Sequence, residues 1–207
     1  SHFFAGITPG SYAQGASFQT TDLQTAHGTN GMAAALVGMY SANTPAEFQC
    51  AVDRLLLLQS LSFFTGGLPL LYMGDELGMG NTAADVLLAR QGPDGRELHR
   101  PNWQEATALL RKQEGTAQHR IFSKLQAFAQ LRKSLPAFHG DVSVQALTSQ
   151  HPAVLALQRG ADLKGFFNFS RQAVVYQVGE AQNLALKPYG FAWLQTGASN
   201  SLRTLID

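Results

Sequence analysis

The spacing of apolar residues predicts two long amphipathic helices in this 207-residue chain. The first begins at Thr44, where a capping hydroxyl, a proline and Glu47 follow one another in the order of a capping box. Gly66 and the glycine after it end this helix. Residues 117–134 carry a second apolar stripe of helical period, and Leu135-Pro136 ends it. A short apolar helix is also expected over residues 31–39.

Residues 68–73 are apolar at every alternating position, which is typical of a strand covered on both faces of a parallel sheet. A helix, a glycine turn and a buried strand in succession indicate α/β architecture. The polar residues from 74 to about 103 are expected to form a long loop at the carboxyl end of this strand. Residues 1–30 show little periodicity and are predicted to be a second long loop.

The pattern changes after Phe138, where short apolar runs alternate with polar or glycine-containing breaks. This spacing predicts a small antiparallel β-sandwich. We therefore expect an α/β part over residues 1–138 and an all-β part over residues 139–207. The expected strands are residues 142–147, 153–158, 163–169, 173–178, 183–186 and 190–195.

Composition excludes several classes of protein. Apolar residues make up 45% of the chain and charged residues 14%, with a net charge of +1, which excludes a disordered chain. The near-neutral charge argues against partners such as nucleic acid or an anionic membrane. Cys50 is the only cysteine, so no intrachain disulfide forms, and a structural thiol is the favoured interpretation.

The sequence also shows no targeting or membrane signal. The first ten residues lack the basic and apolar regions of a signal peptide, which favours a cytoplasmic location. The most apolar stretch, residues 55–73, is interrupted by Gln59, two glycines and Pro69 and is too broken to span a membrane.

The candidate chemistry lies in two polar segments. The histidines lack metal-ligand spacing, so no metal is expected, and no phosphate-binding or serine-hydrolase motif occurs. Adjacent carboxylates such as Asp75-Glu76 could act as acid and base, or could anchor a loop. Neighbours on a strand point in opposite directions, so both cannot face one glycosidic bond. Arg96 and Arg100 could hold a carboxylate, or could be solvated.

Five segments resemble, in order, the α-amylase superfamily (glycoside hydrolase family 13), most closely its amylosucrases and sucrose hydrolases. The glycine-rich run GGLPLLYMGDELG resembles that family's eighth barrel strand. The other four lie on either side of it and together cover nearly the whole chain. They are PGSYAQG at residues 9–15, GMAAALVG at 31–38, DGRELHRP at 94–101 and GFFNFS at 165–170.

The resemblance implies the C-terminal portion of a (β/α)8 barrel, with its last helices and strand eight, followed by the sandwich domain. It also implies that the three catalytic carboxylates lie upstream, so this chain holds no catalytic residue and is inactive alone. Arg96 matches an arginine that pairs with an upstream aspartate to close the bottom of the glucosyl pocket, and it is expected to bind substrate. Supporting or structural roles are expected for Asp75, Glu76, Asp94, His99 and Arg100.

Two departures from the family pattern shift the expected reaction. Gln14 replaces a loop arginine, and His27-Gly28-Thr29-Asn30 stands where amylosucrases carry another arginine. Because those arginines help bind the growing glucan, sucrose hydrolysis is favoured over polymer synthesis. No cofactor is implied.

The expected partners and the alternative function follow from the same resemblance. Sucrose or an α-glucan is the expected substrate of the intact enzyme. A barrel piece leaves strand edges exposed, so we also expect self-association or a missing barrel segment. The alternative is a non-catalytic carbohydrate-binding or assembly module on the same scaffold.

Overall fold

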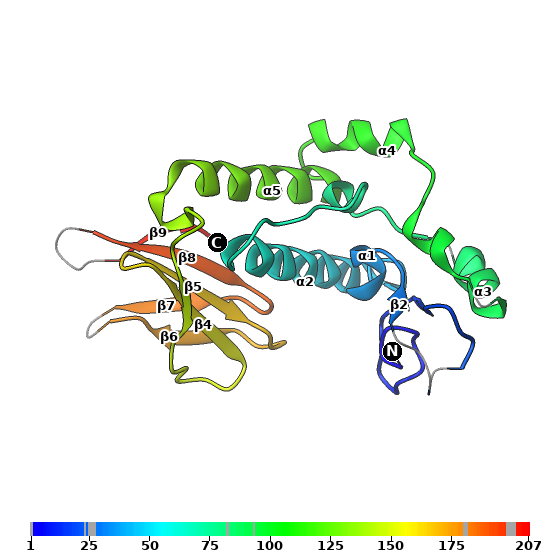
Figure 1. Ribbon diagram of the computed structural model, residues 1–207, viewed down its shortest axis with the longest axis horizontal. Helices are drawn as coiled ribbons and strands as arrows, with labels where there is room; N and C mark the ends of the chain where they lie inside the picture. The colour runs from blue at the N-terminus through cyan, green and yellow to red at the C-terminus, as the bar shows by residue number, and fades with distance from the viewer. Residues whose placement is uncertain are drawn as a thin grey trace. The chain divides into compact units, whose positions relative to one another are not determined.

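The computed structural model describes residues 2–22, 24, 28–81, 83–92, 94–179, 182–197 and 202–207 (Figure 1). The chain divides into two compact units, and each is described by itself. The first unit comprises Ser1–Leu55 and Leu71–Ser123, and the second comprises Leu56–Leu70 and Lys124–Asp207. The predicted boundary between an α/β part (residues 1–138) and an all-β part (residues 139–207) stays a prediction.

The first unit is mainly helical. Its only described strands, β1 (Ala16–Ser17) and β2 (Thr29–Asn30), pair antiparallel. The first loop is otherwise irregular, as expected for residues 1–30. The helical elements that follow are α1 (Ala33–Leu36), the start of α2 (Pro45–Phe64), η1 (Asp75–Leu77), α3 (Ala83–Gln91), η2 (Arg96–His99), α4 (Glu105–Leu109), η3 (Leu110–Lys112) and the start of α5 (Ala117–Ser134).

The two predicted long helices are confirmed. Helix α2 begins at Pro45, and the Glu47 backbone N–H donates to the Thr44 hydroxyl at 3.2 Å. The Glu47 carboxylate accepts the N–H of Asn43 at 2.7 Å, one residue earlier than in an ideal capping box. Helix α5 covers residues 117–134 as predicted, whereas α1 is shorter than the expected residues 31–39.

The predicted loop over residues 74–103 is wrong at its centre, because it contains helix α3. This helix buries Val86 and Ala89 but exposes Leu87 and Leu88 by 60% and 68%. Two apolar side chains on the solvent face blur the helical period, which explains why the pattern did not reveal the helix.

The predicted buried strand over residues 68–73 is not present. This segment has no strand structure, and Leu68 and Leu70 are exposed by 95% and 85%. Every strand pair in the described residues is antiparallel, and none includes this segment. An apolar run predicts a buried strand only when neighbouring strands and a covering layer exist to bury it.

The second unit contains two antiparallel sheets. The larger has the order β3-β4-β5-β8-β9, and the smaller is the hairpin β6-β7. All six predicted strands are confirmed, and β9 was not predicted because Ile206, exposed by 9%, is its only buried residue. The strands are β3 (Val144–Ala146), β4 (Val154–Arg159), β5 (Leu163–Asn168), β6 (Val174–Gln177), β7 (Asn183–Leu186), β8 (Phe191–Thr196) and β9 (Leu202–Ile206).

The central strands of the larger sheet are buried on both faces. One face, with Phe166, Ala192 and Leu194, packs in a core with Val174 and Tyr176 of the hairpin. The period-two alternation of side chains sends the intervening residues of β5 and β8 to the other face. Both faces therefore need apolar side chains, which explains why apolar residues follow one another along these strands instead of alternating with polar ones.

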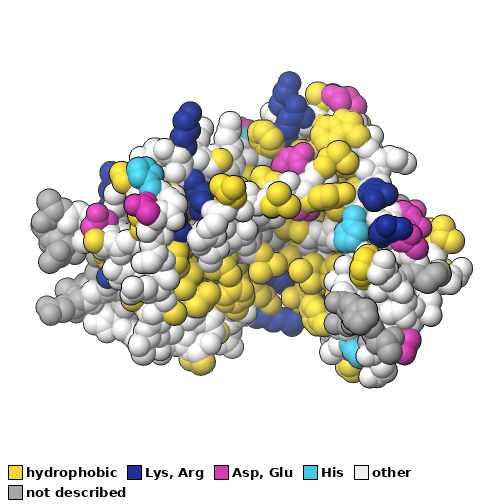
Figure 2. All heavy atoms as spheres, in the orientation of Figure 1, with side chains coloured by type: hydrophobic (Ala, Val, Ile, Leu, Met, Phe, Trp, Pro, Cys, Tyr) yellow, Lys and Arg dark blue, Asp and Glu magenta, His cyan; other side chains and the backbone are white. Residues whose placement is uncertain are grey.

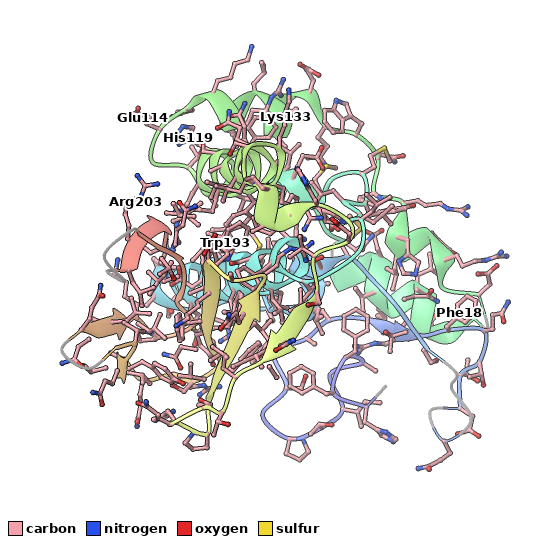
Figure 3. All side chains as sticks on the ribbon, turned by 60° about the vertical axis from the view of Figure 1, so that its left-hand side comes forward. Phe18, Glu114, His119, Lys133, Trp193 and Arg203 are labelled. Carbon is pink, nitrogen blue, oxygen red and sulfur yellow. The ribbon has the colours of Figure 1, made fainter. Side chains whose placement is uncertain are left out.

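An aromatic cluster fills the second face of this sheet. Phe64 near the end of α2 contacts Trp193 and Phe167, with ring centroids 5.4 and 5.6 Å apart. Phe128 of α5 stacks on Trp193 at 5.1 Å and also contacts Phe191. Trp193, labelled in Figure 3, is 0% exposed. The ends of the two long helices are thus fixed to the sheet by aromatic packing.

Candidate functional site

Asp94 and Arg96 form a bidentate ion pair at the start of η2. The Arg96 Nε lies 2.8 and 3.1 Å from the two Asp94 carboxylate oxygens, and its Nη2 lies 2.6 Å from Oδ2. The Arg96 backbone N–H also donates to Asp94 at 3.2 Å. Both side chains are about half exposed, at 53% and 51%. The predicted substrate-binding guanidinium is therefore paired with Asp94 at the surface.

The turn that carries Arg96 is attached to the first loop. Leu98 is 1% exposed and packs with Ala16, Val86 and Ala89. The next residue, His99, donates from Nε2 to the Oδ1 of fully buried Asn30 at 2.7 Å. These contacts make the position of Arg96 depend on the loop around β1 and β2.

Asn30 and Gly95 complete this attachment. The Asn30 amide nitrogen donates to the Ser17 carbonyl at 3.2 Å, so both ends of the side chain are used. A Cβ at Gly95 would lie 3.0 Å from that amide nitrogen and 3.6 Å from the Cβ of Ala16. Glycine therefore allows the turn to approach the loop closely.

Arg90 fixes the same loop from helix α3. Its Nε donates to the Gly15 carbonyl at 3.0 Å, and its Nη2 donates to the carbonyl of Ala5. The sequence analysis did not identify Arg90 or the role of Asn30 beside His99. Both act over more than sixty residues of chain, and no local spacing reveals such a pairing.

The adjacent carboxylates Asp75 and Glu76 lie in the separate turn η1 rather than at a strand end. The Glu76 Oε2 accepts the backbone N–H of Gly74 at 2.8 Å. The carboxylate of Asp75 accepts backbone hydrogen bonds from Ala33 and Tyr72, and its Oδ1 is buried without a hydrogen-bond partner in the described residues. Both carboxylates thus accept hydrogen bonds from backbone N–H groups.

Two carboxylates have displaced pKa values. Burial raises the pKa of Asp75 above its usual 3.8, and the neighbouring Glu76 adds to this effect. Hydrogen bonds from Arg96 lower the pKa of Asp94 to about 2, and they raise the pKa of Arg96. Asp94 is therefore ionised at neutral pH, where the guanidinium of Arg96 is charged with or without this partner.

The remaining predicted residues are placed as follows. Arg100 is exposed immediately after η2. Gln14 donates its backbone N–H to Ala35 at 3.1 Å, and its Oε1 is buried without a partner in the described residues. His27 lies outside the described residues. Cys50 is half-buried, and its Sγ accepts a hydrogen bond from Arg54 at 3.3 Å.

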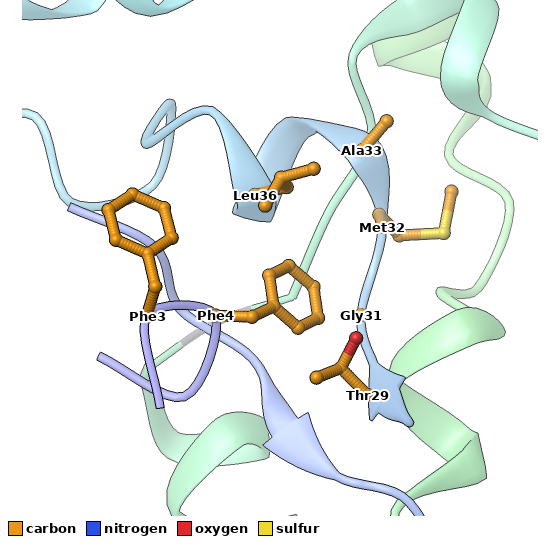
Figure 4. A pocket seen from close by; sticks show the side chains of 7 residues that line it. All are labelled: Phe3, Phe4, Thr29, Gly31, Met32, Ala33 and Leu36. Atoms are coloured by element: carbon orange, nitrogen blue, oxygen red, sulfur yellow. The ribbon is translucent and has the colours of Figure 1, made fainter. Parts of the chain in front are cut away.

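An apolar cavity of about 440 Å³ lies beside the first loop (Figure 4). The ring of Phe4 is seated between Gly15 and Gly31, where added Cβ atoms would come within 2.5 and 2.7 Å of it. Thr29 is the one polar side chain among the lining residues, so the cavity offers little to fix a polar ligand. The lining residues are Phe3, Phe4, Thr29, Gly31, Met32, Ala33 and Leu36.

No group of three metal-ligating side chains occurs within the residues that the structure describes. Among the same residues, no helix has the length and hydropathy needed to cross a membrane.

Comparison with known proteins finds a likeness in fold to a solved structure. No family model matches the chain. The solved structure of the type III pullulan hydrolase from Thermococcus kodakarensis is similar to 75% of this chain, with a TM-score of 0.54 and 19% sequence identity. The match covers 25% of that protein, so this chain spans about a quarter of its length. At this identity the likeness concerns the fold, a mixture of helices and antiparallel sheet.

Proposed function

We propose that this chain is part of a carbohydrate-active enzyme of the α-amylase superfamily that cleaves an α-glucosidic bond. The observation that carries the proposal is the agreement between two independent signals. The structural neighbour is a pullulan hydrolase, and five motifs of this chain resemble that superfamily in the same order. A shared fold alone does not fix function, so the motifs supply the chemical part of the argument.

Sucrose is the substrate that we propose, with Arg96 as a binding residue of the glucosyl pocket. The guanidinium already forms a bidentate pair with Asp94. The same geometry would hold a carboxylate or two hydroxyls of a ligand. Because both partners are exposed, the pair is screened by solvent and can exchange Asp94 for another acceptor at small cost. The buried Leu98 and the His99–Asn30 hydrogen bond keep the turn in place during such an exchange.

The catalytic carboxylates of this enzyme would lie upstream, as the resemblance implies. The carboxylates of Glu76 and Asp94 are consistent with this, because each accepts a hydrogen bond from a residue two positions away. The purified 207-residue chain is expected to leave sucrose intact. Release of glucose or fructose by this chain alone would contradict that part of the proposal.

The test uses the complete enzyme that contains this chain. We expect Arg96→Ala to raise KM for sucrose by about tenfold or more, the loss of one charge-assisted contact. Arg203→Ala is the matched control, because Arg203 is an exposed arginine on β9 that contacts Gln195 (Figure 3). A wild-type enzyme that does not consume sucrose would refute the proposal that sucrose is the substrate. An unchanged KM in Arg96→Ala would refute the role of Arg96.

The second candidate is a non-catalytic module that binds carbohydrate. It is favoured by the way the carboxylates of this chain are used, since those of η1 anchor a loop and that of Asp94 orients an arginine. Binding of an oligosaccharide by the 207-residue chain, with no upstream partner able to restore cleavage, would select this candidate over the first.

A further inference from the structure

We propose that the Asp94–Gly95 step is a site of spontaneous covalent modification, the isomerisation of aspartate to isoaspartate, and that the ion pair with Arg96 restrains this reaction. Asp94 is the only aspartate of the chain that a glycine follows. The modification consumes no reagent other than water, so it depends neither on sucrose nor on an upstream segment.

The reaction joins the Gly95 backbone nitrogen to the side-chain carboxyl carbon of Asp94. The nitrogen forms a bond to Cγ and gives up its proton, while a hydroxyl leaves the protonated carboxyl, and the two depart together as water. The product is a five-membered succinimide ring, which one water molecule then opens. Cleavage of the new bond between Cγ and nitrogen restores aspartate. Cleavage at the main-chain carbonyl leaves isoaspartate, in which the backbone runs through the former side chain.

Both reacting groups are accessible in the folded chain. The side chain of Asp94 is 51% exposed. Gly95 has no Cβ that could block the approach to its nitrogen, and its N–H donates no hydrogen bond within the part of the chain that the structure describes. In Figure 2, acidic and basic side chains lie side by side at the exposed surface near α3. Water and the leaving group can therefore enter and depart freely.

Arg96 holds the carboxylate in an unreactive state. Its Nε and Nη2 reach the two carboxylate oxygens at 2.6–3.1 Å, and its backbone N–H donates to Oδ1 at 3.2 Å. These hydrogen bonds favour the ionised form, which is the cause of the low pKa of Asp94 and which loses water less readily than the protonated form. They also oppose the rotation that brings Cγ onto the nitrogen. Because the pair is exposed, it opens readily, and the restraint is partial.

The dipeptide Asn30–Gly31 gives a contrast within the same chain. An asparagine before glycine forms the same ring with loss of ammonia, and in unstructured chains it reacts faster than an aspartate. Here Asn30 is 0% exposed, and hydrogen bonds to His99 and Ser17 occupy both ends of its amide. The fold thus protects the more reactive dipeptide and leaves the less reactive one open.

Isoaspartate at position 94 would release Arg96. The main chain becomes one atom longer between residues 94 and 95, and the carboxylate is attached directly to Cα, so the bidentate pair no longer fits. The turn has little room to adjust towards the first loop, since a Cβ on Gly95 would already lie 3.0 Å from the Asn30 amide nitrogen. The modification therefore changes the surroundings of the guanidinium rather than a remote part of the surface.

The test incubates the folded 207-residue chain in mildly acidic buffer and locates isoaspartate by peptide mass spectrometry. We expect isoaspartate at position 94 in wild type, and formation about two- to fivefold faster in Arg96→Ala, the factor that matches the strength of an exposed ion pair. Arg96→Lys keeps the charge without the bidentate geometry and should react at an intermediate rate. Arg203→Ala is the matched control, because Arg203 is an exposed arginine on β9, and its rate should equal that of wild type.

Unfolding in urea separates the restraint from the chemistry. In the unfolded chain the ion pair is absent, so wild type and Arg96→Ala should form isoaspartate at position 94 at similar rates. Asn30 should then react faster than Asp94. Asp94→Glu should give no product at this position, because its side chain would have to close a less favourable six-membered ring. Circular dichroism of each variant before incubation confirms that the folded samples are folded.

Three results would overturn the inference. The first is a folded Arg96→Ala chain without isoaspartate at position 94, and the second is an equal rate in folded wild type and folded Arg96→Ala. The third is modification of Asn30 ahead of Asp94 in the folded chain. None of these measurements uses sucrose, so their outcome is separate from that of the proposed function.

Discussion

The Trp193 indole nitrogen donates a hydrogen bond to the Ser60 hydroxyl at 3.0 Å, across 133 residues of sequence. Both residues are 0% exposed. The bond joins helix α2 to strand β8 inside the aromatic cluster of the second unit. A buried indole N–H needs an acceptor, and this serine provides one in an otherwise apolar environment.

Removal of this hydroxyl should destabilise the second unit. We expect Ser60→Ala to lower the free energy of unfolding by about 1–3 kcal/mol, since the buried indole N–H loses its acceptor. Denaturant unfolding measures the change, and Ser62→Ala on the exposed side of the same helix is the control. A double-mutant cycle with Trp193→Phe should give a coupling energy clearly above zero. Equal stability of Ser60→Ala and wild type would refute the importance of the bond.

The close contact between the Phe4 ring and Gly15 limits the size of the side chain that position 15 can hold. A Cβ there would lie 2.5 Å from the Phe4 ring, so we expect Gly15→Ala to lower the free energy of unfolding by about 1–3 kcal/mol through overpacking. Gly66→Ala, with no atom within 4 Å of the added Cβ, is the control and should be nearly neutral. The smaller side chain in Phe4→Leu should recover part of the loss. Thermal unfolding that does not distinguish the two glycine variants would contradict the close contact.

Asp75 predicts a pH dependence of stability. Its pKa is raised in the folded chain, so the folded state binds more protons than the unfolded state between the usual 3.8 and the raised value. Stability should therefore fall as the pH rises through that window. Asp75→Asn keeps an acceptor for the backbone N–H groups and should remove this slope, while exposed Asp141→Asn should not. Unfolding curves at a series of pH values check the difference in slope.

The pKa of Asp94 is shifted in the opposite direction from that of Asp75, so its ion pair with Arg96 is lost as the pH falls. Its pKa of about 2 lies below the usual 3.8, so the pair with Arg96 is complete above pH 3.8 and is lost as the pH falls towards 2. In Arg96→Ala the pKa of Asp94 should rise towards 3.8. In Arg100→Ala it should rise less, because Arg100 acts only through its charge. Carboxyl-carbon NMR titration measures both, and an unshifted Asp94 in Arg96→Ala would exclude the pair in solution.

The exposed segment 68–73 predicts self-association. Leu68 and Leu70 are exposed by 95% and 85%, and such apolar surface favours contact with a second molecule. Static light scattering should show a mass that increases with protein concentration, and Leu68→Lys with Leu70→Lys should reduce the increase. The control is Leu109→Lys, which replaces a different exposed leucine. A constant monomer mass at high concentration would contradict the expectation.

The sequence predicted the elements that local chemistry determines. Thr44, Pro45 and Glu47 start α2, and Pro136 follows the end of α5, because capping groups and proline act over a few residues. The strands of the second unit were predicted from short apolar runs separated by polar or glycine-containing breaks.

The failures share one physical cause, which is dependence on distant residues. Helix α3 exposes Leu87 and Leu88, so its burial pattern does not match its composition. Residues 68–73 have the composition of a core strand without a partner strand in the described chain. At the candidate site, Arg96 and its partner Asp94 are two residues apart and both were identified. Asn30 lies 69 residues from His99, and no spacing rule connects them.

The two tryptophans of the chain give it a pair of built-in optical reporters. Trp103 belongs to the first unit and is half exposed, whereas Trp193 belongs to the second and is completely buried. Indole emission shifts to longer wavelength in water, so the red part of the fluorescence reports on one unit and the blue part on the other. Acrylamide should quench the red component first. Unfolding of each unit can thus be followed in one unlabelled sample.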